Sequence, residues 1–156
     1  MKKILVLLAA AFCLFVSCGK EDPIDGGGRG KDKENKDICS KMEDSKFKSF
    51  CLSYFDSNND GKISSEEAVS VKKMDCENKG ITSLKGIEYF TSLTYLNCRN
   101  NKLTSLDVSK NTKLVEFWCD YNNLTSLDVS KNTQLTVFIY NPQADSRHII
   151  PTGWRK

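Results

Sequence analysis

The decapeptide LTSLDVSKNT occurs twice without a change, at residues 103–112 and again at residues 124–133, which is an offset of 21 residues. Recurrence at a fixed period of this size is the signature of a repeat protein, in which each unit is one small supersecondary element. A single unit cannot bury its apolar side alone, so neighbouring units have to stack before a continuous core exists. The sequence therefore predicts a solenoid.

Two complete units align around the decapeptide, at residues 93–113 and 114–134, and share the frame L-x-x-L-x-C-x-x-N-x-L-T-x-L. A looser copy precedes them at residues 71–92, and a decayed copy follows at residues 135–143. Because the complete and partial copies are contiguous, we expect a stack of three to four coils over residues 71–143.

The frame resembles that of the leucine-rich repeats, and one copy matches it at Leu93, Leu96, Cys98, Asn101, Leu103, Leu106 and Val108. The resemblance implies an α/β-type repeat solenoid in which every coil has a short strand, a turn and an irregular return path. Parallel strands of successive coils would then lie about 4.8 Å apart and form one sheet.

Side chains alternate along a strand, so Leu96 and Cys98 are expected to point inward and Asn97 outward. Asn101 and Asn122 share the next conserved position of the frame, inside the turn. Their amides can there pair with backbone groups that the strand ladder does not reach.

Cys76, Cys98 and Cys119 occupy one frame position, so they should form a buried column. We interpret them as small apolar side chains rather than metal ligands, because no histidine or second cysteine lies at ligand spacing. Cys39 and Cys51 lie ahead of the repeats, and the sequence allows either a disulfide between them or two free thiols.

The outward strand positions give a candidate ligand-binding site for a protein or a glycan. Tyr95 and Trp118 should be neighbours there, flanked by Arg99, Glu116 and Asp120. Aromatic residues and arginine are over-represented among binding hot spots, and an exposed indole suits a sugar face or an apolar side chain. The alternative is that the aromatic pair only stabilises the sheet.

Ahead of the repeats, the stretch DSNNDGKISSEE at residues 56–67 has the spacing of an EF-hand loop. Gly61 occupies the sixth position, where the backbone bends sharply. The expected Ca²⁺ ligands are Asp56, Asn58, Asp60, Lys62 through its carbonyl, Ser64 and Glu67. Three carboxylates in so small a space repel one another unless a cation neutralises them. A metal-free loop is the alternative interpretation.

Residues 38–70 are expected to cap the first coil with this loop between two helices. The first helix is predicted by apolar residues at three- and four-residue spacing: Phe47, Phe50, Cys51, Tyr54 and Phe55. The second is short, because few apolar residues remain before the first repeat. Residues 144–156 form a C-terminal tail in which Trp154 is a candidate to cover the last strand.

The first 17 residues have the charge and apolar run of an export signal, and the run is too short to span a bilayer. Ser17-Cys18 resembles the end of a bacterial lipobox, which implies a lipid on Cys18 and a membrane anchor; an ordinary secretory signal is the alternative. Residues 18–37 then form a flexible tether, because they are rich in glycine and charge. Lys20–Asp22 resembles a signal for the cell surface of Gram-negative bacteria.

Charge and residue types restrict the function. Removal of residues 1–17, with Lys2 and Lys3, lowers the formal charge from +3 to +1, which leaves no basic stripe for nucleic acid. His148 is the only histidine. Glu116 and Asp120 could serve glycoside hydrolysis, but pKa values are hard to shift on an open face. A calcium-binding, membrane-anchored interaction module is therefore favoured over an accessory lipoprotein without a ligand, and both over a glycan-active enzyme.

Overall fold

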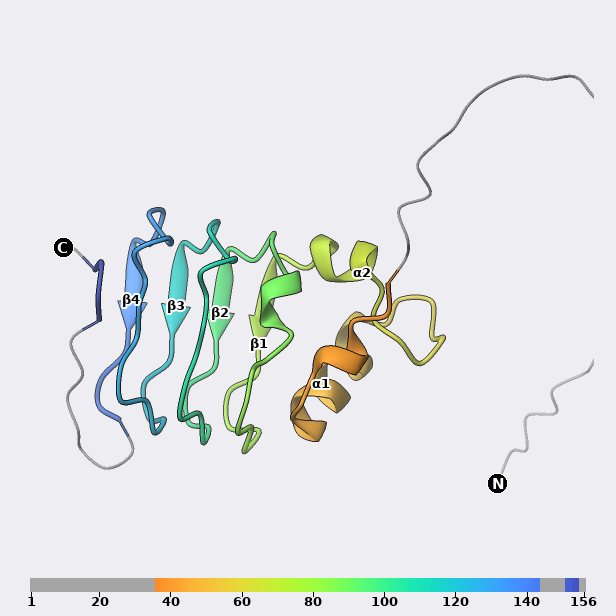
Figure 1. The fold of residues 1–156 in the computed structure, drawn as a ribbon, viewed down its shortest axis with the longest axis horizontal. Helices are drawn as coiled ribbons and strands as arrows, with labels where there is room; N and C mark the ends of the chain where they lie inside the picture. Colours follow the sequence, from red (N-terminus) through yellow and green to blue (C-terminus); the bar gives the residue numbers. More distant parts are fainter. Residues whose placement is uncertain (1–35, 144–150, 155–156) are drawn as a thin grey trace, which may run out of the picture. The chain divides into compact units, whose positions relative to one another are not determined.

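The computed structural model describes residues 36–143 and 151–154, and these include four short strands in one parallel sheet. The strands are β1 (Lys73–Asp75), β2 (Tyr95–Asn97), β3 (Glu116–Trp118) and β4 (Val137–Ile139). They lie side by side in chain order, as Figure 1 shows. Each strand opens one coil, so the predicted stack is confirmed, with four coils.

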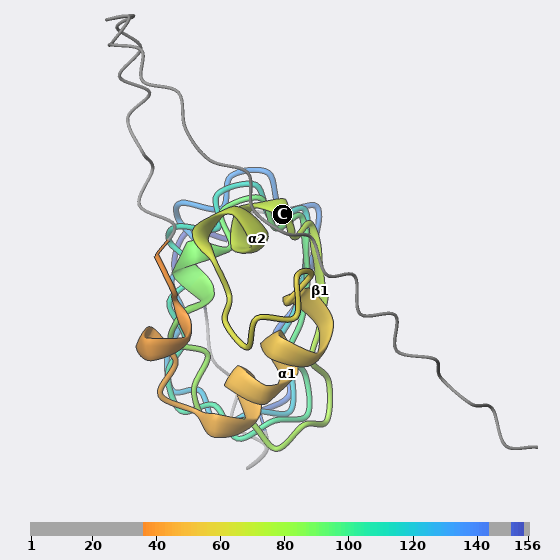
Figure 2. The same ribbon diagram turned by 90° about the vertical axis from the view of Figure 1, so that its right-hand side faces the viewer.

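The coils stack in register around a shared apolar interior. Leu96 lies opposite Met74 on one side and Phe117 on the other, and all three are completely buried. Viewed along the stack, successive coils follow nearly the same outline (Figure 2). Burying a side chain of this size contributes roughly 1.5–3 kcal/mol, so each coil is stabilised mainly by its neighbours.

Asn101 fills the interior of its turn, as the repeat frame predicted. Its Oδ1 accepts hydrogen bonds from the backbone amides of Lys79 and Ile81, at 3.1 and 3.0 Å. Its Nδ2 donates to the carbonyl oxygens of Cys76 and Cys98, both at 2.9 Å. One amide side chain therefore satisfies backbone groups of two coils.

The same position repeats this pattern in the next two coils. Asn122 Oδ1 accepts from the Leu103 amide at 3.1 Å, and its Nδ2 donates to the Cys119 carbonyl at 3.0 Å. In the last coil Gln143 takes over this role, because its Oε1 accepts from the Leu124 amide at 3.0 Å. Both amide side chains are buried.

A second amide ladder, on the return path, was not anticipated from the sequence. Asn111 Nδ2 donates to the carbonyl oxygens of Ile87 and Phe90, at 2.9 and 3.0 Å. One coil further on, Asn132 Nδ2 donates to the carbonyl oxygens of Val108 and Asn111, at 3.0 and 2.9 Å. Asn111 and Asn132 are the asparagines of the duplicated decapeptide, so the repeat itself carried this signal.

Helix α1 (Ser45–Phe55) lies at the β1 end of the stack (Figure 1). Asp44 caps it, because its Oδ1 accepts from the backbone amides of Lys46 and Phe47. The other oxygen of Asp44 accepts from the amide and the hydroxyl of Thr82, at 2.7 and 2.5 Å. A single carboxylate thus begins the helix and fastens it to the first coil.

The apolar face of α1 is narrower than its sequence spacing indicated. Phe47, Phe50 and Cys51 are buried, whereas Tyr54 remains 66% exposed. Tyr54 contacts the Phe50 ring at a centroid distance of 4.8 Å, so it extends the aromatic cluster outward instead of joining the core. Two short 3₁₀ turns, Cys39–Lys41 and Ile87–Tyr89, complete the described helical elements together with α2 (Ser65–Ser70).

The far end of the stack is covered by the C-terminal residues. Trp154 lies edge-on against Phe138 of β4, with ring centroids 5.1 Å apart. Thr152 exchanges backbone hydrogen bonds with Leu127 and Val129, each at 2.8 Å. The tail therefore pairs with the return path of the third coil, in the place where the return path of the fourth coil would lie.

The residues of the predicted export signal, Cys18 as the predicted lipidation site, the predicted tether up to residue 35 and His148 lie outside the described residues. Within the described part of the chain, no helix combines the length and the apolar character needed to cross a membrane.

Candidate interaction surface and cation loop

The outward side of the sheet, here called the strand face, is built from alternate positions of the four coils. Its residues are Lys73, Asp75, Glu77, Tyr95, Asn97, Arg99, Glu116, Trp118, Asp120, Val137, Ile139 and Asn141. The register places Tyr95 beside Glu116, and Trp118 between Asn97 and Ile139. The five residues predicted for binding therefore lie on one surface.

Aromatic rings and one guanidinium group occupy the middle of the strand face. The rings of Tyr95 and Trp118 lie 6.4 Å apart between centroids and are tilted by 48°, which agrees with their predicted proximity. The Arg99 guanidinium lies 5.9 Å from the Trp118 ring and 5.8 Å from the Tyr121 ring. Such contacts contribute roughly 0.5–1 kcal/mol at exposed sites.

Tyr121 borders the strand face through its contact with Arg99 and was not predicted from the sequence. It is 45% exposed and has a left-handed backbone, with φ of 54°. Asn78 and Asn100 occupy the corresponding turns with φ of 53° each, and asparagine tolerates this conformation well. The sequence does contain a signal for Tyr121: one coil has a bulky aromatic residue where the two preceding coils have asparagine. Strained positions of this kind concentrate at functional sites.

Asp120 departs from the expectation of an open, solvated face. It is only 2% exposed, and its Oδ2 lies 3.2 Å from Arg99 Nη2. Burial raises the pKa of Asp120, and the Arg99 guanidinium offsets part of that effect. The expectation of an open face, on which pKa values are hard to shift, was therefore wrong for Asp120, because its carboxylate is buried. Asp120 and Arg99 form an ion pair, so each side chain compensates the charge of the other.

Glu77 completes a row with Arg99 and Asp120 across three coils. Glu77 Oε1 lies 3.5 Å from Arg99 Nε, and its Oε2 accepts a hydrogen bond from Asn97 Nδ2 at 3.0 Å. Asn97 was expected to be exposed on the outward side, but these contacts leave it 2% exposed. Two carboxylates thus share one guanidinium group.

The loop of residues 56–67 connects α1 to α2 and folds around its own backbone. Asp56 accepts from the backbone amides of Asp60 and Gly61, at 3.1 and 2.9 Å. Asn58 Oδ1 also accepts from the Asp60 amide, and Asp60 Oδ1 accepts from the Lys62 amide. Gly61 has φ of 77°, the left-handed bend expected at the sixth position of the loop.

Glu67, the last predicted ligand, belongs to the start of α2. Its Oε2 accepts from the amide and hydroxyl of Ser64 in a capping box, and its Oε1 accepts from the amide and hydroxyl of Ser57. Burial raises the pKa of Glu67, but these hydrogen bonds outweigh it and bring the pKa down to about 2. Among the described residues, no three or more His, Cys, Asp or Glu side chains are grouped as metal ligands.

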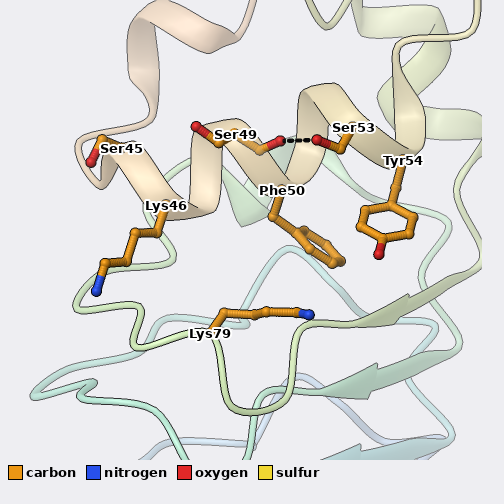
Figure 3. Close-up of a pocket in the computed structure, with 7 residues that line it drawn as sticks. All are labelled: Ser45, Lys46, Ser49, Phe50, Ser53, Tyr54 and Lys79. Carbon is orange, nitrogen blue, oxygen red and sulfur yellow. Dashed lines mark hydrogen bonds between the residues drawn. The ribbon is translucent and has the colours of Figure 1, made fainter.

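A shallow hollow lies between α1 and the first coil, away from both predicted sites. It is lined by Ser45, Lys46, Ser49, Phe50, Ser53, Tyr54 and Lys79 (Figure 3). Lys46 Nζ donates to the Gly80 carbonyl at 3.1 Å, and Ser53 Oγ donates to the Ser49 carbonyl at 2.8 Å. These polar groups are therefore engaged in fastening the cap and its helix.

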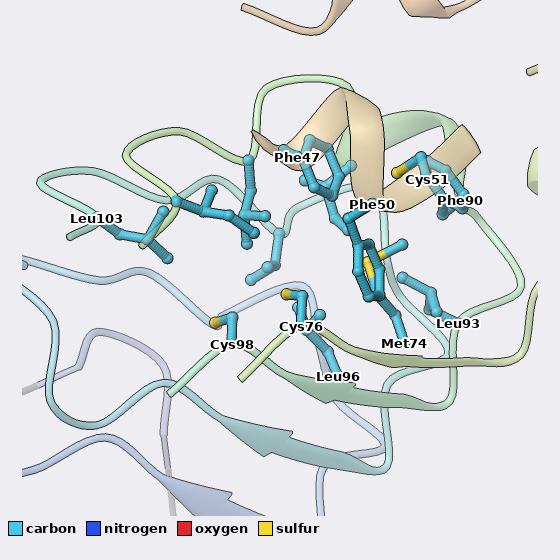
Figure 4. Close-up of a cluster of buried hydrophobic side chains, with 14 of the residues drawn as sticks. Phe47, Phe50, Cys51, Met74, Cys76, Phe90, Leu93, Leu96, Cys98 and Leu103 are labelled. Carbon is cyan, nitrogen blue, oxygen red and sulfur yellow. The ribbon is translucent and has the colours of Figure 1, made fainter. Parts of the chain in front are cut away.

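The five described cysteines are free thiols, and all are buried. Cys76 and Cys98 project into the interior below α1, which carries Cys51 (Figure 4). Burial raises the pKa of Cys51 well above its usual value, and the nearby Cys76 and Cys39 add to the effect. Burial also raises the pKa of Cys76 to about 12. The predicted column is confirmed, and the two cysteines of the cap stay unpaired.

The repeat frame, the parallel sheet and the buried amide ladders together define a solenoid of the leucine-rich-repeat type. The chain is 41% identical over 69 residues to Internalin J of Listeria monocytogenes serotype 4b (strain F2365). That match covers 44% of this chain but only 8% of the relative. No protein-family model matches the chain.

Solved structures of internalins agree with the fold. The functional domain of InlJ from Listeria monocytogenes, described as including a cysteine ladder, superimposes with a TM-score of 0.65 and 35% identity. The superposition covers 70% of this chain and 24% of that one. Internalin InlF from Listeria monocytogenes strain F2365 follows with a TM-score of 0.62 and 24% identity over 72% of this chain and 34% of that one, which supports the fold alone.

Proposed function

We propose that the protein is an interaction module whose strand face binds another protein. The observation that carries this proposal is the group of aromatic and aliphatic side chains left accessible on that face. Trp118 and Tyr95 are half-buried, whereas Val137 and Ile139 are 39% and 38% exposed. The similarity to Internalin J supports an interaction role, although the chain spans a small part of that relative. A glycan is the second candidate, because an indole can stack on a sugar ring.

A binding screen with one matched pair of variants tests this proposal. The purified protein is screened against bacterial and host surface proteins and against glycans, alongside Ile139→Ser and Val69→Ser. Both positions carry exposed β-branched side chains, but Val69 is on α2, with 43% exposure. We expect Ile139→Ser to weaken capture of the protein ligand about tenfold and Val69→Ser to leave it unchanged. Equal capture by both variants would exclude the strand face, and absence of any capture would favour an accessory role.

We further propose that the loop of residues 56–67 binds Ca²⁺. The donor set supports this: the side chains of Asp56, Asn58 and Asp60 each present at least one oxygen atom, the ligand type that Ca²⁺ prefers. The Lys62 carbonyl and Ser64 complete the order of an EF-hand loop.

Glu67 would have to exchange part of its capping interaction for the cation. Its Oε1 accepts two hydrogen bonds from Ser57, each at 2.8 Å, and these are the bonds that a cation would replace. The low pKa of Glu67 keeps the carboxylate ionised near neutral pH, as a cation ligand must be.

Calcium should stabilise the protein through this loop. At 10 mM Ca²⁺ and a dissociation constant of about 10⁻⁴ M, the expected gain in unfolding free energy is about 2.7 kcal/mol. The double variant Asp56→Asn, Glu67→Gln should lose this gain and the heat of binding in titration calorimetry. The variant Glu66→Gln, which changes an exposed neighbouring carboxylate, should keep both. Equal heats from the wild type and the double variant would show that this loop does not bind Ca²⁺.

Anchoring by a lipid on Cys18, at the surface of the outer membrane, is the third part of the proposal. It is motivated by the lipobox-like Ser17-Cys18 and by the Lys20–Asp22 stretch that follows. Two or more acyl chains hold a protein durably on a bilayer. Cys18→Ser should therefore move the protein from the membrane fraction to the soluble fraction, and unchanged fractionation would refute the anchor.

A further inference from the structure

The strand face carries more acidic than basic side chains, unlike residues 36–143 as a whole. It carries four carboxylates and two cationic side chains: Asp75, Glu77, Glu116 and Asp120 against Lys73 and Arg99. The difference is 2 − 4, a net charge of −2, whereas residues 36–143 together hold 14 Lys or Arg and 14 Asp or Glu, a net charge of 0. The acidic excess is therefore a property of this surface and not of the composition.

Acidic and apolar side chains of the strand face lie in adjacent rows. Trp118 lies beside Ile139 in the sheet register, with Val137 next to Glu116 one row away. The next row along the face holds the charged side chains of Glu77, Arg99 and Asp120, and Arg99 contacts the Trp118 ring. The face thus offers an apolar area with acidic groups along its edge.

Three buried polar atoms of this surface have no hydrogen-bond partner. They are Arg99 Nε, Trp118 Nε1 and Asp120 Oδ1. Buried polar groups in folded proteins are nearly always paired, because an unpaired one costs about 1–3 kcal/mol. Asp120 is 98% buried as a residue, yet one of its two oxygens accepts nothing. The surface therefore holds an unused acceptor beside an excess of negative charge.

A cationic group from a partner would offset the excess of negative charge. Arg99 is shared by Glu77 at 3.5 Å and Asp120 at 3.2 Å, so one guanidinium compensates two carboxylates. A second ammonium or guanidinium group would meet this row at Glu77, whose side chain is 42% exposed, whereas Asp120 is buried. A neutral sugar would leave the charge uncompensated, and an anionic one would be repelled.

We propose that the strand face recognises a protein segment in which a lysine or arginine side chain stands next to an apolar one. The apolar side chain packs on Trp118 and Ile139, and the cationic group binds at the row of Glu77 and Asp120. This inference rests on the proposed interaction function and specifies the chemistry of the partner. Such charge complementarity contributes to specificity and to the association rate.

Matched synthetic peptides test the inference. Three sets share a Leu-Phe pair and differ only in the flanking residues, which are lysine and arginine, glutamine, or glutamate. We expect the purified protein to bind the basic set at least about tenfold more tightly than the acidic set at 50 mM salt, with a smaller ratio at 500 mM because salt screens the charges. Equal binding of the basic and acidic sets, or no binding of the basic set, would overturn the inference.

Variants of the protein locate the effect. Glu77→Gln removes one half-exposed carboxylate, and we expect it to weaken basic-peptide binding about threefold to tenfold at low salt. Asp107→Asn removes an exposed carboxylate outside the strand face and should leave binding unchanged. The contribution of the buried Asp120 carboxylate to binding is measured with Asp120→Asn, and circular dichroism checks that this variant folds. Unchanged affinity in Glu77→Gln would contradict the inference.

The outcome also separates this inference from the proposed function. If Ile139→Ser abolishes capture of a protein ligand that does not depend on basic residues, the face is a binding site but its charge is not the selector. If Ile139→Ser has no effect on any ligand, the proposed function itself fails.

Discussion

Replacing Asn122 with alanine is expected to lower the free energy of unfolding by about 3 kcal/mol, because it leaves buried backbone groups without partners. Asn122 Oδ1 accepts from the Leu103 amide, and its Nδ2 donates to the carbonyl oxygens of Cys98, Cys119 and Asp120. Leu103 and Cys119 belong to different coils, so the change loosens the contact between them. Urea unfolding followed by circular dichroism measures the effect.

The adjacent residue provides the control. Asn123 has the same side chain but is exposed, and only its backbone amide bonds to the Leu103 carbonyl, at 2.8 Å. Asn123→Ala should therefore change the unfolding free energy by less than about 0.5 kcal/mol. Similar losses in the two variants would show that the amide ladder does not hold the coils together.

Replacing Trp118 with alanine is expected to cost at least 2 kcal/mol of binding free energy, roughly a thirtyfold loss of affinity for the protein ligand. The indole lies at the centre of the strand face, between Tyr95 at 6.4 Å and the Arg99 guanidinium at 5.9 Å. Removing it takes away both the apolar contact and the support for Arg99. Surface plasmon resonance with the captured ligand measures the loss.

Two further variants separate binding from folding. Tyr54→Ala removes an aromatic ring of high exposure on α1, outside the strand face, and should leave the affinity unchanged. Trp118→Phe keeps a ring but removes the unpaired N–H, so it should retain most of the affinity if packing dominates. Unaltered affinity in Trp118→Ala, with an unchanged far-ultraviolet spectrum, would favour a purely structural role for the aromatic pair.

The period of the repeat carried most of the information about the fold. The exact recurrence of ten residues fixed the length of a coil, and alternation within each strand then placed Cys98 inward and Trp118 outward. Asn101 and Asn122 were predictable because only a polar side chain with donors and acceptors suits the interior of a turn. These inferences depend on geometry within one coil, and the same residue pattern recurs in several coils of the sequence.

Properties that depend on contacts between coils were not predictable in the same way. Asp120 is buried because Arg99 of the preceding coil reaches across to it, and no pattern within one repeat shows such a contact. Tyr54 keeps the helical spacing of the buried residues but lies beyond the edge of the contact with the first coil. The loop of residues 56–67 has its ligand types in order, although Glu67 also serves as a helix cap.

The coils stack with the cysteine column inside and the strand face outside. Thiol labelling of Ile139→Cys with a maleimide, read out by mass spectrometry, is the sharpest test of this arrangement, because Cys119 serves as an internal reference one strand away. We predict that the introduced thiol reacts rapidly under native conditions, whereas Cys98 and Cys119 react only after denaturation. Native labelling of Cys119, or protection of the introduced thiol, would contradict the account.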